Sequence, residues 1–119
     1  MHPASVAHTF AAAFNAGDPA AVDAVYEPGA LFVPQPGTTV TGAARRDANQ
    51  RFLGLGLPID VRPRHVYEHD GIALLIVDWS IGDVHGTATD VARRGADGRW
   101  RYVIDNPFGV SQAAPGHRS

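Results

Sequence analysis

The sequence predicts an α+β domain in which helices pack on one face of an antiparallel sheet. In the first half of the chain, apolar residues recur every three or four positions, as they do in helices. From residue 59 onward the period is two, which is typical of strands. Three tight-turn signals divide this second half into four strands of a meander. The chain has 119 residues, 45% of them apolar, which is enough for one domain with its own core.

Two helices are expected at the start of the chain. The first covers residues 4–16 and has one apolar face, formed by Val6, Phe10, Ala13 and Phe14. Gly17 follows it as the residue that ends the helix. Asp18 and Pro19 then begin a second helix, because aspartate caps helices well and proline is favoured at the first helical position. This second helix is expected to continue until Pro28.

A short strand and a third helix follow. The strand is expected at residues 30–34, and residues 35–41 are expected to form a loop because they are rich in proline, glycine and threonine. The third helix covers residues 42–53, with its arginines and Asp47 on a solvated face.

The rest of the domain is expected to be a four-stranded meander. Its strands are expected at residues 59–69, 72–81, 84–94 and 99–106. Asp70-Gly71 is a strong hairpin signal between the first two strands. The domain is expected to span residues 1–110, with a disordered tail at residues 111–119.

Composition excludes several classes of protein. The chain has no cysteine, which excludes disulfides, thiolate metal sites and thiol nucleophiles. Its net charge of -2 gives no field that would attract nucleic acid or an anionic membrane. No apolar run approaches the length of a membrane span, and residues 1–15 lack the pattern of a signal peptide. We therefore expect a cytoplasmic protein that binds neither nucleic acid nor membranes.

Three local signatures occur in a specific order along the chain. They are Phe14-Asn15-Ala16-Gly17-Asp18 before a short helix, the stretch 30–34 with Val40-Thr41-Gly42 after it, and the ending made of residues 90–94, 97–101 and 104–107. Over residues 6–108 the chain thus resembles the NTF2-like superfamily, in its SnoaL-like and ketosteroid-isomerase-like branch. The resemblance implies a cystatin-like cone, in which a curved, mostly antiparallel sheet and three helices enclose a pocket. Members include steroid isomerases, polyketide cyclases, epoxide hydrolases, scytalone dehydratases and proteins with no known activity, so the fold alone does not define the function.

Asp90 is the first candidate for chemistry. It shares a strand face with small residues, including Gly86 and Ala88, which leave space for a pocket. Burial there would raise the pKa of the carboxyl, and a neutral acid can donate a hydrogen bond to a substrate oxygen. The resemblance places Asp90 where the isomerases keep their oxyanion-hole aspartic acid. The alternative is a structural aspartate bonded to a turn.

The resemblance also argues against steroid isomerase activity. Phe10 stands where the isomerases have a tyrosine, and Pro34 stands where they have the general-base aspartate. Neither side chain can transfer the proton that the steroid reaction requires.

Asp105 and Trp79 are further candidates. On the resemblance, Val103 and Asp105 point inward, so that Asp105 could converge on Asp90 and form an acid–base pair. Alternatively, Asp105 only caps the end of its strand. Trp79 and Val77 share one strand face, where the tryptophan is either an aromatic wall for a ligand or a plug that fills the core.

Partners are predicted from the remaining residues. Both faces of residues 72–81 are apolar, and Trp100, Tyr102 and Ile104 are expected to extend the outer face, so we expect a homodimer through this convex face. His65 and His69 lie too far apart along a strand to share a metal, and no metal or cofactor is expected. Arg62 and Arg64 share a face, where they either bind a ligand carboxylate or are solvated.

Two functions remain open at this point. The first is a cofactor-independent isomerase, cyclase or hydrolase that acts on a small apolar molecule through Asp90 and Asp105. Its ligand would be held by Phe10, Phe14, Pro34, Val77, Trp79 and Val103. The second is a non-catalytic module that binds a ligand or dimerises.

Overall fold

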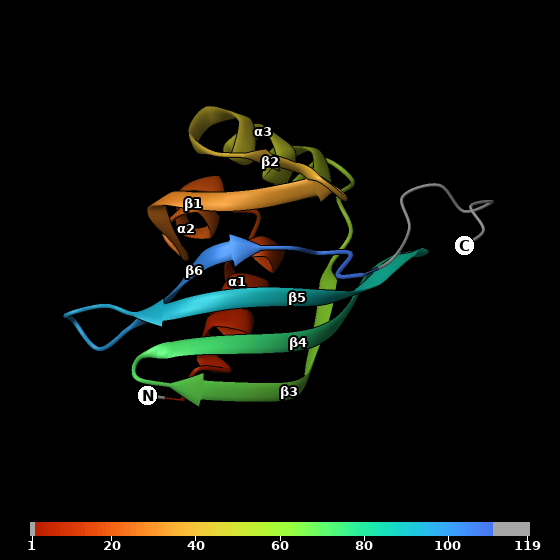
Figure 1. Ribbon diagram of the computed structural model, residues 1–119. Helices are drawn as coiled ribbons and strands as arrows, with labels where there is room; N and C mark the ends of the chain where they lie inside the picture. The colour runs from red at the N-terminus through yellow and green to blue at the C-terminus, as the bar shows by residue number, and fades with distance from the viewer. Residues whose placement is uncertain (1, 111–119) are drawn as a thin grey trace.

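The computed structural model describes residues 2–110, and the predicted tail at residues 111–119 lies outside them. One six-stranded sheet runs through the molecule in the order β2-β1-β6-β5-β4-β3. The strands β1 and β6 are parallel and the other neighbours are antiparallel. In Figure 1, α1 and α2 lie behind this curved sheet and α3 lies at its β2–β1 edge, which confirms the α+β fold. The elements are α1 (Ser5–Asn15), α2 (Pro19–Asp23), β1 (Tyr26–Gln35), β2 (Thr38–Val40), α3 (Gly42–Leu53), β3 (Ile59–His69), β4 (Ile72–Ile81), β5 (Val84–Arg94) and β6 (Trp100–Asp105).

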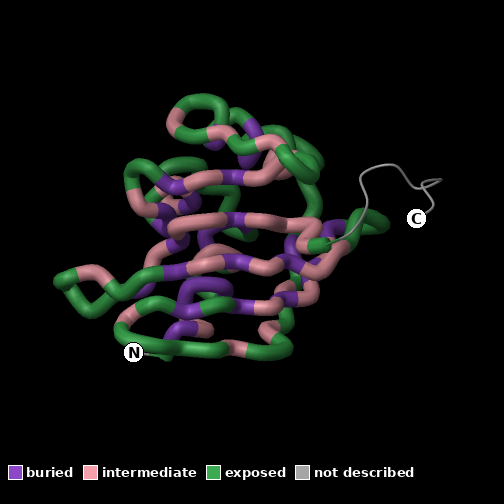
Figure 2. The backbone as a smooth tube through the Cα atoms, viewed as in Figure 1, coloured by how far each residue is buried: buried purple, intermediate pink, exposed green. Residues whose placement is uncertain are grey.

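The core lies between the helices and the inner face of the sheet. Strict alternation along β4 buries Ala73, Leu75, Val77, Trp79 and Ile81, whereas Ile72 and Leu74 are 39% and 40% exposed. The buried residues in Figure 2 follow this pattern along the central strands. Val6 and Phe14 of α1 complete the core from the helical side. This division into two faces is the one that the period of two predicts.

The start of β1 differs from the expectation that residues 18–28 form one helix. The helix α2 ends at Asp23, and Tyr26 already pairs with Tyr102 of the parallel strand β6. The backbone N–H of Tyr102 donates to the carbonyl of Val25 at 2.9 Å. The register shifts between Tyr26 and Leu31, and Pro28 is tolerated in this irregular stretch because no regular ladder bond is required of it. Long-range pairing therefore overrides the local helical pattern.

A second difference is the short strand β2 where a loop was expected. Thr38–Val40 folds back on the end of β1, with Phe32 opposite Val40 and Gln35 opposite Thr38. Gly37, at a φ of 82°, allows the tight turn between the two strands.

The strand β6 contains a β-bulge that changes which side chains face inward. Val91 of β5 pairs with Ile104, but the next residue, Ala92, pairs with Tyr102. Val103 is therefore the extra residue, and the alternation of β6 changes sides at this point. Asp105 faces inward as expected. The expectation that Val103 also does so is wrong, and Trp100 and Tyr102 are buried on the inner face rather than placed on the outer one.

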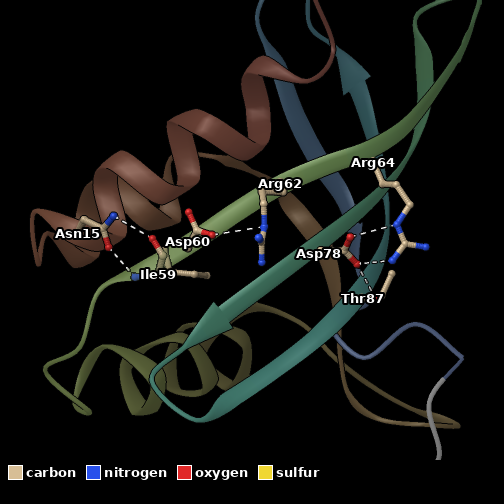
Figure 3. Close-up of polar contacts among 7 residues, drawn as sticks. All are labelled: Asn15, Ile59, Asp60, Arg62, Arg64, Asp78 and Thr87. Atoms are coloured by element: carbon tan, nitrogen blue, oxygen red, sulfur yellow. Dashed lines mark hydrogen bonds and ion pairs between the residues drawn. The ribbon is translucent and has the colours of Figure 1, made fainter.

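Asn15 joins the end of α1 to the beginning of β3. Its amide nitrogen donates to the carbonyl of Ile59 at 3.0 Å, and its amide oxygen accepts from the N–H of Ile59 at 2.8 Å (Figure 3).

We expect Asn15→Ala to lower the free energy of unfolding by about 1–2 kcal/mol, because two backbone groups lose their partner. Urea unfolding would measure the change, with Gln50→Ala on exposed α3 surface as the control. Equal stability of the two variants would contradict this role of Asn15.

Candidate functional site

A cavity of about 50 Å³ lies between the helices and the inner face of the sheet. Most of its lining is apolar, and the polar lining residues are Asn49, Asp90, Tyr102 and Asp105. Six of the predicted site residues line this cavity: Phe10, Phe14, Val77, Trp79, Asp90 and Asp105.

Pro34 and Val103 do not line the cavity, which corrects their predicted placement. Phe32, two residues before Pro34, is the lining residue of β1 and pairs with Asp105. Pro34 lies further along β1, where the register with β2 shifts. Val103 is the bulged residue of β6, as described above.

Asp90 is a buried carboxyl at the centre of β5, with 4% of its surface exposed. Its Oδ1 accepts a hydrogen bond from the backbone N–H of Asn106 at 2.9 Å. Burial raises the pKa of Asp90 well above its ordinary value, and the charge of Asp105 raises it further. The N–H of Asn106 acts in the opposite direction but does not outweigh burial. The surroundings of Asp90 therefore favour its protonated form.

Asp105 lies beside Asp90 and has a different set of partners. Its Oδ2 accepts a hydrogen bond from the hydroxyl of Tyr26 at 2.5 Å. Burial raises the pKa of Asp105, whereas the hydrogen bonds from Tyr26 and Asp90 and the charge of Arg45 lower it. Burial outweighs these partners, so the pKa of Asp105 is also raised, but they oppose the rise and make Asp105 the more readily ionised member of the pair.

Tyr26 is held by two residues of α3. Asn49 donates to the Tyr26 hydroxyl from its Nδ2 at 3.1 Å. The guanidinium carbon of Arg45 lies 4.4 Å from the centre of the Tyr26 ring, and its Nη1 lies 2.8 Å from Oδ1 of Asp23. Arg45 is 1% exposed, so the expectation that all arginines of this helix are solvated is wrong.

The sequence contains a signal for this inward face of α3. Arg45, Asn49 and Phe52 recur at intervals of four and three, together with Ala48, and therefore share one side of the helix. Because arginine and asparagine are polar, residue type suggests that they face solvent, and this obscures the spacing that places them on the inward side of α3.

Tyr102 is a further polar residue that the sequence did not reveal, because the bulge in β6 turns it inward. It lines the cavity, and its ring packs against the rings of Phe10 and Tyr26, at centroid distances of 6.1 and 5.4 Å. Burial raises the pKa of Tyr102 well above its ordinary value, and the nearby charges of Asp90 and Asp105 add to this effect. The phenol therefore stays neutral and can donate a hydrogen bond to a molecule in the cavity.

Trp79 both lines the cavity and reduces its volume. Its indole N–H donates to the carbonyl of Pro107 at 2.6 Å, and its ring lies 5.5 Å from that of Phe108 and 6.2 Å from that of Phe52. A Cβ at Gly86 would lie 3.1 Å from the Trp79 ring. The space that this small residue leaves on β5 is thus occupied by Trp79.

The outer-face arginines are engaged with acids of the same face. The Arg64 guanidinium donates two hydrogen bonds to the Asp78 carboxylate, at 2.6 and 3.0 Å, in a bidentate ion pair (Figure 3). Asp78 also accepts a hydrogen bond from the Thr87 hydroxyl at 2.7 Å. The Nε of Arg62 lies 3.4 Å from Asp60. Both arginines lie outside the cavity lining, and within residues 2–110 no group of three histidine or acidic side chains could hold a metal ion.

The helices and the curved mixed sheet, with a cavity between them, define an α+β protein of the NTF2-like, cystatin-like class. Comparison with protein families matches residues 7–103 to the SnoaL-like domain, and the chain belongs to this family. The predicted SnoaL-like branch is thereby confirmed. A comparison with curated proteins finds no match to the chain.

Solved structures support the same fold. A Thiobacillus denitrificans protein named for the calcium/calmodulin-dependent protein kinase type II association domain is 25% identical, with a TM-score of 0.75 over 92% of this chain and 95% of that one. An NTF-2-like protein of unknown function from Shewanella oneidensis is 15% identical, with a TM-score of 0.71 over 85% and 91% of the two chains. A ketosteroid isomerase-like protein from Erwinia carotovora is 17% identical, with a TM-score of 0.60 over 92% and 94%. The likeness to the last two shows the fold alone.

In the part of the chain that the structure describes, none of the helices has the length and apolar character needed to cross a membrane.

The raised pKa of Asp90 predicts a specific dependence of stability on pH. In the unfolded chain the carboxyl ionises near pH 3.8, whereas in the folded protein it stays protonated to higher pH. Its contribution to stability is therefore complete below pH 3.8 and is lost as the pH rises through the folded pKa. Asp90→Asn should reduce this loss, because the amide cannot ionise and can still accept from Asn106 and donate to Asp105.

Urea unfolding of the wild type and Asp90→Asn at several pH values above 3.8 measures this difference. Asp47→Asn, at an exposed site on α3, is the control and should keep the wild-type slope. Identical slopes for all three proteins would contradict a neutral, buried Asp90.

Proposed function

We propose that this SnoaL-like protein binds a small neutral molecule with a carbonyl, enol or epoxide oxygen and acts on it by acid–base chemistry. The reaction would be that of a cofactor-independent isomerase, cyclase or hydrolase. One observation carries the proposal: Asp90 and Asp105 lie side by side, buried, in the lining of an otherwise mainly apolar cavity. Groups whose environments favour different protonation states can divide the roles of acid and base between them.

The roles follow from the partners of each carboxyl. Asp90 carries one proton, which it donates to Asp105 in the free protein and would donate to the ligand oxygen once a ligand is bound. The Tyr102 hydroxyl is a second donor toward the same space. Asp105 is the carboxylate that accepts a proton from a carbon or from water. In an isomerisation, that proton would then return from Asp105 to a different carbon, so the protein ends in its starting state.

The cavity lining also restricts the ligand. Among the described lining residues none is a cation, so the carboxylate of Asp105 would repel an acidic ligand. The volume of about 50 Å³ is well below the roughly 150 Å³ of an engineered apolar cavity that binds benzene. A ring-sized ligand therefore requires lining side chains to move.

The proposal can be tested by hydrogen exchange at a ketone. Wild-type protein in deuterated water should speed the exchange of the α-hydrogens of cyclopentanone, followed by ¹H NMR. Asp105→Asn should reduce the catalysed rate about 10²-fold or more, because the amide cannot accept the proton. The exposed acid Asp60 provides the control, since Asp60→Asn should exchange at the wild-type rate. Equal catalysed rates in wild type and Asp105→Asn, or exchange no faster than in buffer, would exclude this acid–base role.

A second candidate function, as a dimerisation module, is favoured by the outer face of the sheet. Tyr67, Ile72 and Leu74 are 58%, 39% and 40% exposed and lie on adjacent strands, with Tyr67 directly opposite Leu74. The Arg64–Asp78 and Arg93–Glu27 pairs add polar groups to the surface. The Thiobacillus relative is named for an association domain, which supports assembly through a shared fold. We propose that a second copy of the chain covers this face.

Sedimentation velocity tests this assembly. The wild type should sediment as a dimer, and Leu74→Arg should sediment as a monomer because the charge would be buried in the interface. Leu55 is 49% exposed but lies in the loop after α3, so Leu55→Arg should remain dimeric. A monomeric wild type, or a dimeric Leu74→Arg, would contradict the proposed interface.

A further inference from the structure

Arg45 is a buried cation behind the acid pair. It is 1% exposed, and its Nε has no hydrogen-bond partner among the described residues. Burial of a guanidinium is strongly unfavourable unless other groups compensate for the loss of water. Its Nη1 pairs with Asp23 at 2.8 Å, but the Asp23 side chain is 37% exposed, so water weakens that compensation. The Arg45–Asp23 ion pair, which joins α3 to α2, therefore does not fully compensate for the free energy of burying the Arg45 guanidinium.

The second contact of Arg45 leads to the cavity. Its guanidinium carbon lies 4.4 Å from the centre of the Tyr26 ring, a favourable position for a cation over an aromatic face. Tyr26 in turn donates its hydroxyl to Asp105 at 2.5 Å, and Asn49 supports the same hydroxyl at 3.1 Å. One face of α3 thus fixes both the ring and the hydroxyl of the tyrosine that faces Asp105.

We propose that Arg45 is a positioning residue for the acid–base pair: it holds Tyr26 against Asp105 and places a buried positive charge next to that tyrosine. This inference rests on the acid–base function proposed above for the cavity. Arg45 contacts no ligand, since it lies outside the cavity lining, and acts through Tyr26 and through its charge.

The charged and titratable groups around Asp105 support this role. They are Asp90 from β5, Tyr26 from β1, Tyr102 from β6 itself and Arg45 from α3. The lining residues of α1, β3 and β4 are apolar or, in Trp79, uncharged. Arg45 is the cation that lowers the pKa of Asp105. Its removal should therefore shift ionisation of the pair to higher pH.

Carboxyl ¹³C NMR of the ligand-free protein, as a function of pH, tests the proposal directly. Arg45→Met should raise the apparent pKa at which the Asp90–Asp105 pair first ionises, because the stabilising charge is lost. Arg45→Lys should restore most of the wild-type value, because it keeps the charge. Asp23→Asn should shift the pKa in the opposite direction, because it removes the anion that offsets Arg45. Arg46→Met, one residue along α3 and exposed, is the matched control and should leave the titration unchanged.

The opposite shifts of Arg45→Met and Asp23→Asn distinguish the proposal from a purely structural role. If Arg45 and Asp23 only joined α3 to α2, both variants would lose stability, but the apparent pKa of the Asp90–Asp105 pair would not shift in opposite directions. Unchanged ionisation in the two variants would overturn the proposal. If Arg45→Met does not fold, Asp23→Asn decides: a downward shift supports the proposal and an unchanged titration overturns it.

The NMR titration is made on the ligand-free protein, so its result does not depend on whether the protein catalyses ketone exchange. Ketone exchange with an unchanged titration in Asp23→Asn and Arg45→Met would overturn the role of Arg45 alone. The expected shifts without any catalysed exchange would overturn the proposed function alone.

Discussion

The burial of two adjacent carboxyls is the constraint on which the site depends. Asp90 and Asp105 are 4% and 8% exposed, and both would resist ionisation if burial acted alone. Their neighbours make them unequal: Asp90 accepts one backbone N–H from Asn106, whereas Asp105 accepts the Tyr26 hydroxyl and has its pKa lowered by the charge of Arg45. A shared proton then has a preferred location, and the difference between the two carboxyls comes from the surrounding elements rather than from residue type.

This constraint explains features of the fold that are otherwise irregular. The bulge at Val103 brings Tyr102 and Asp105 to the same side of β6, which strict alternation forbids. The parallel pairing of β1 with β6 places Tyr26 opposite Tyr102 and Phe32 opposite Asp105. Both departures from a simple antiparallel meander therefore act on the same short segment of β6, where the second carboxyl lies.

Strand faces that repeat every second residue can be predicted from the sequence, whereas features that depend on pairing between distant segments cannot. Alternation along residues 72–81 and 84–94 predicts the inner faces and the inward position of Asp90, because each face repeats every second residue. Nothing local marks the bulge, since Val103 is an ordinary strand residue without a neighbouring glycine or proline. Tyr26 continues a helical pattern and leaves it only because β6 offers a parallel partner. Arg45 was assigned to solvent by residue type, although its spacing to Asn49 and Phe52 indicates an inward face.

The segment that follows β6 connects the size of the cavity with the acid. The N–H of Asn106 binds Asp90, and the carbonyl of the next residue, Pro107, accepts from the indole of Trp79. Asn106 is itself anchored to Thr89 through its side chain at 3.0 Å and through its carbonyl, which accepts the Thr89 N–H at 3.0 Å. If a ligand displaces this segment together with Trp79, it also removes a hydrogen bond that favours the ionised form of Asp90. The pKa of Asp90 then rises further, so opening of the cavity by this route and protonation of its acid favour each other.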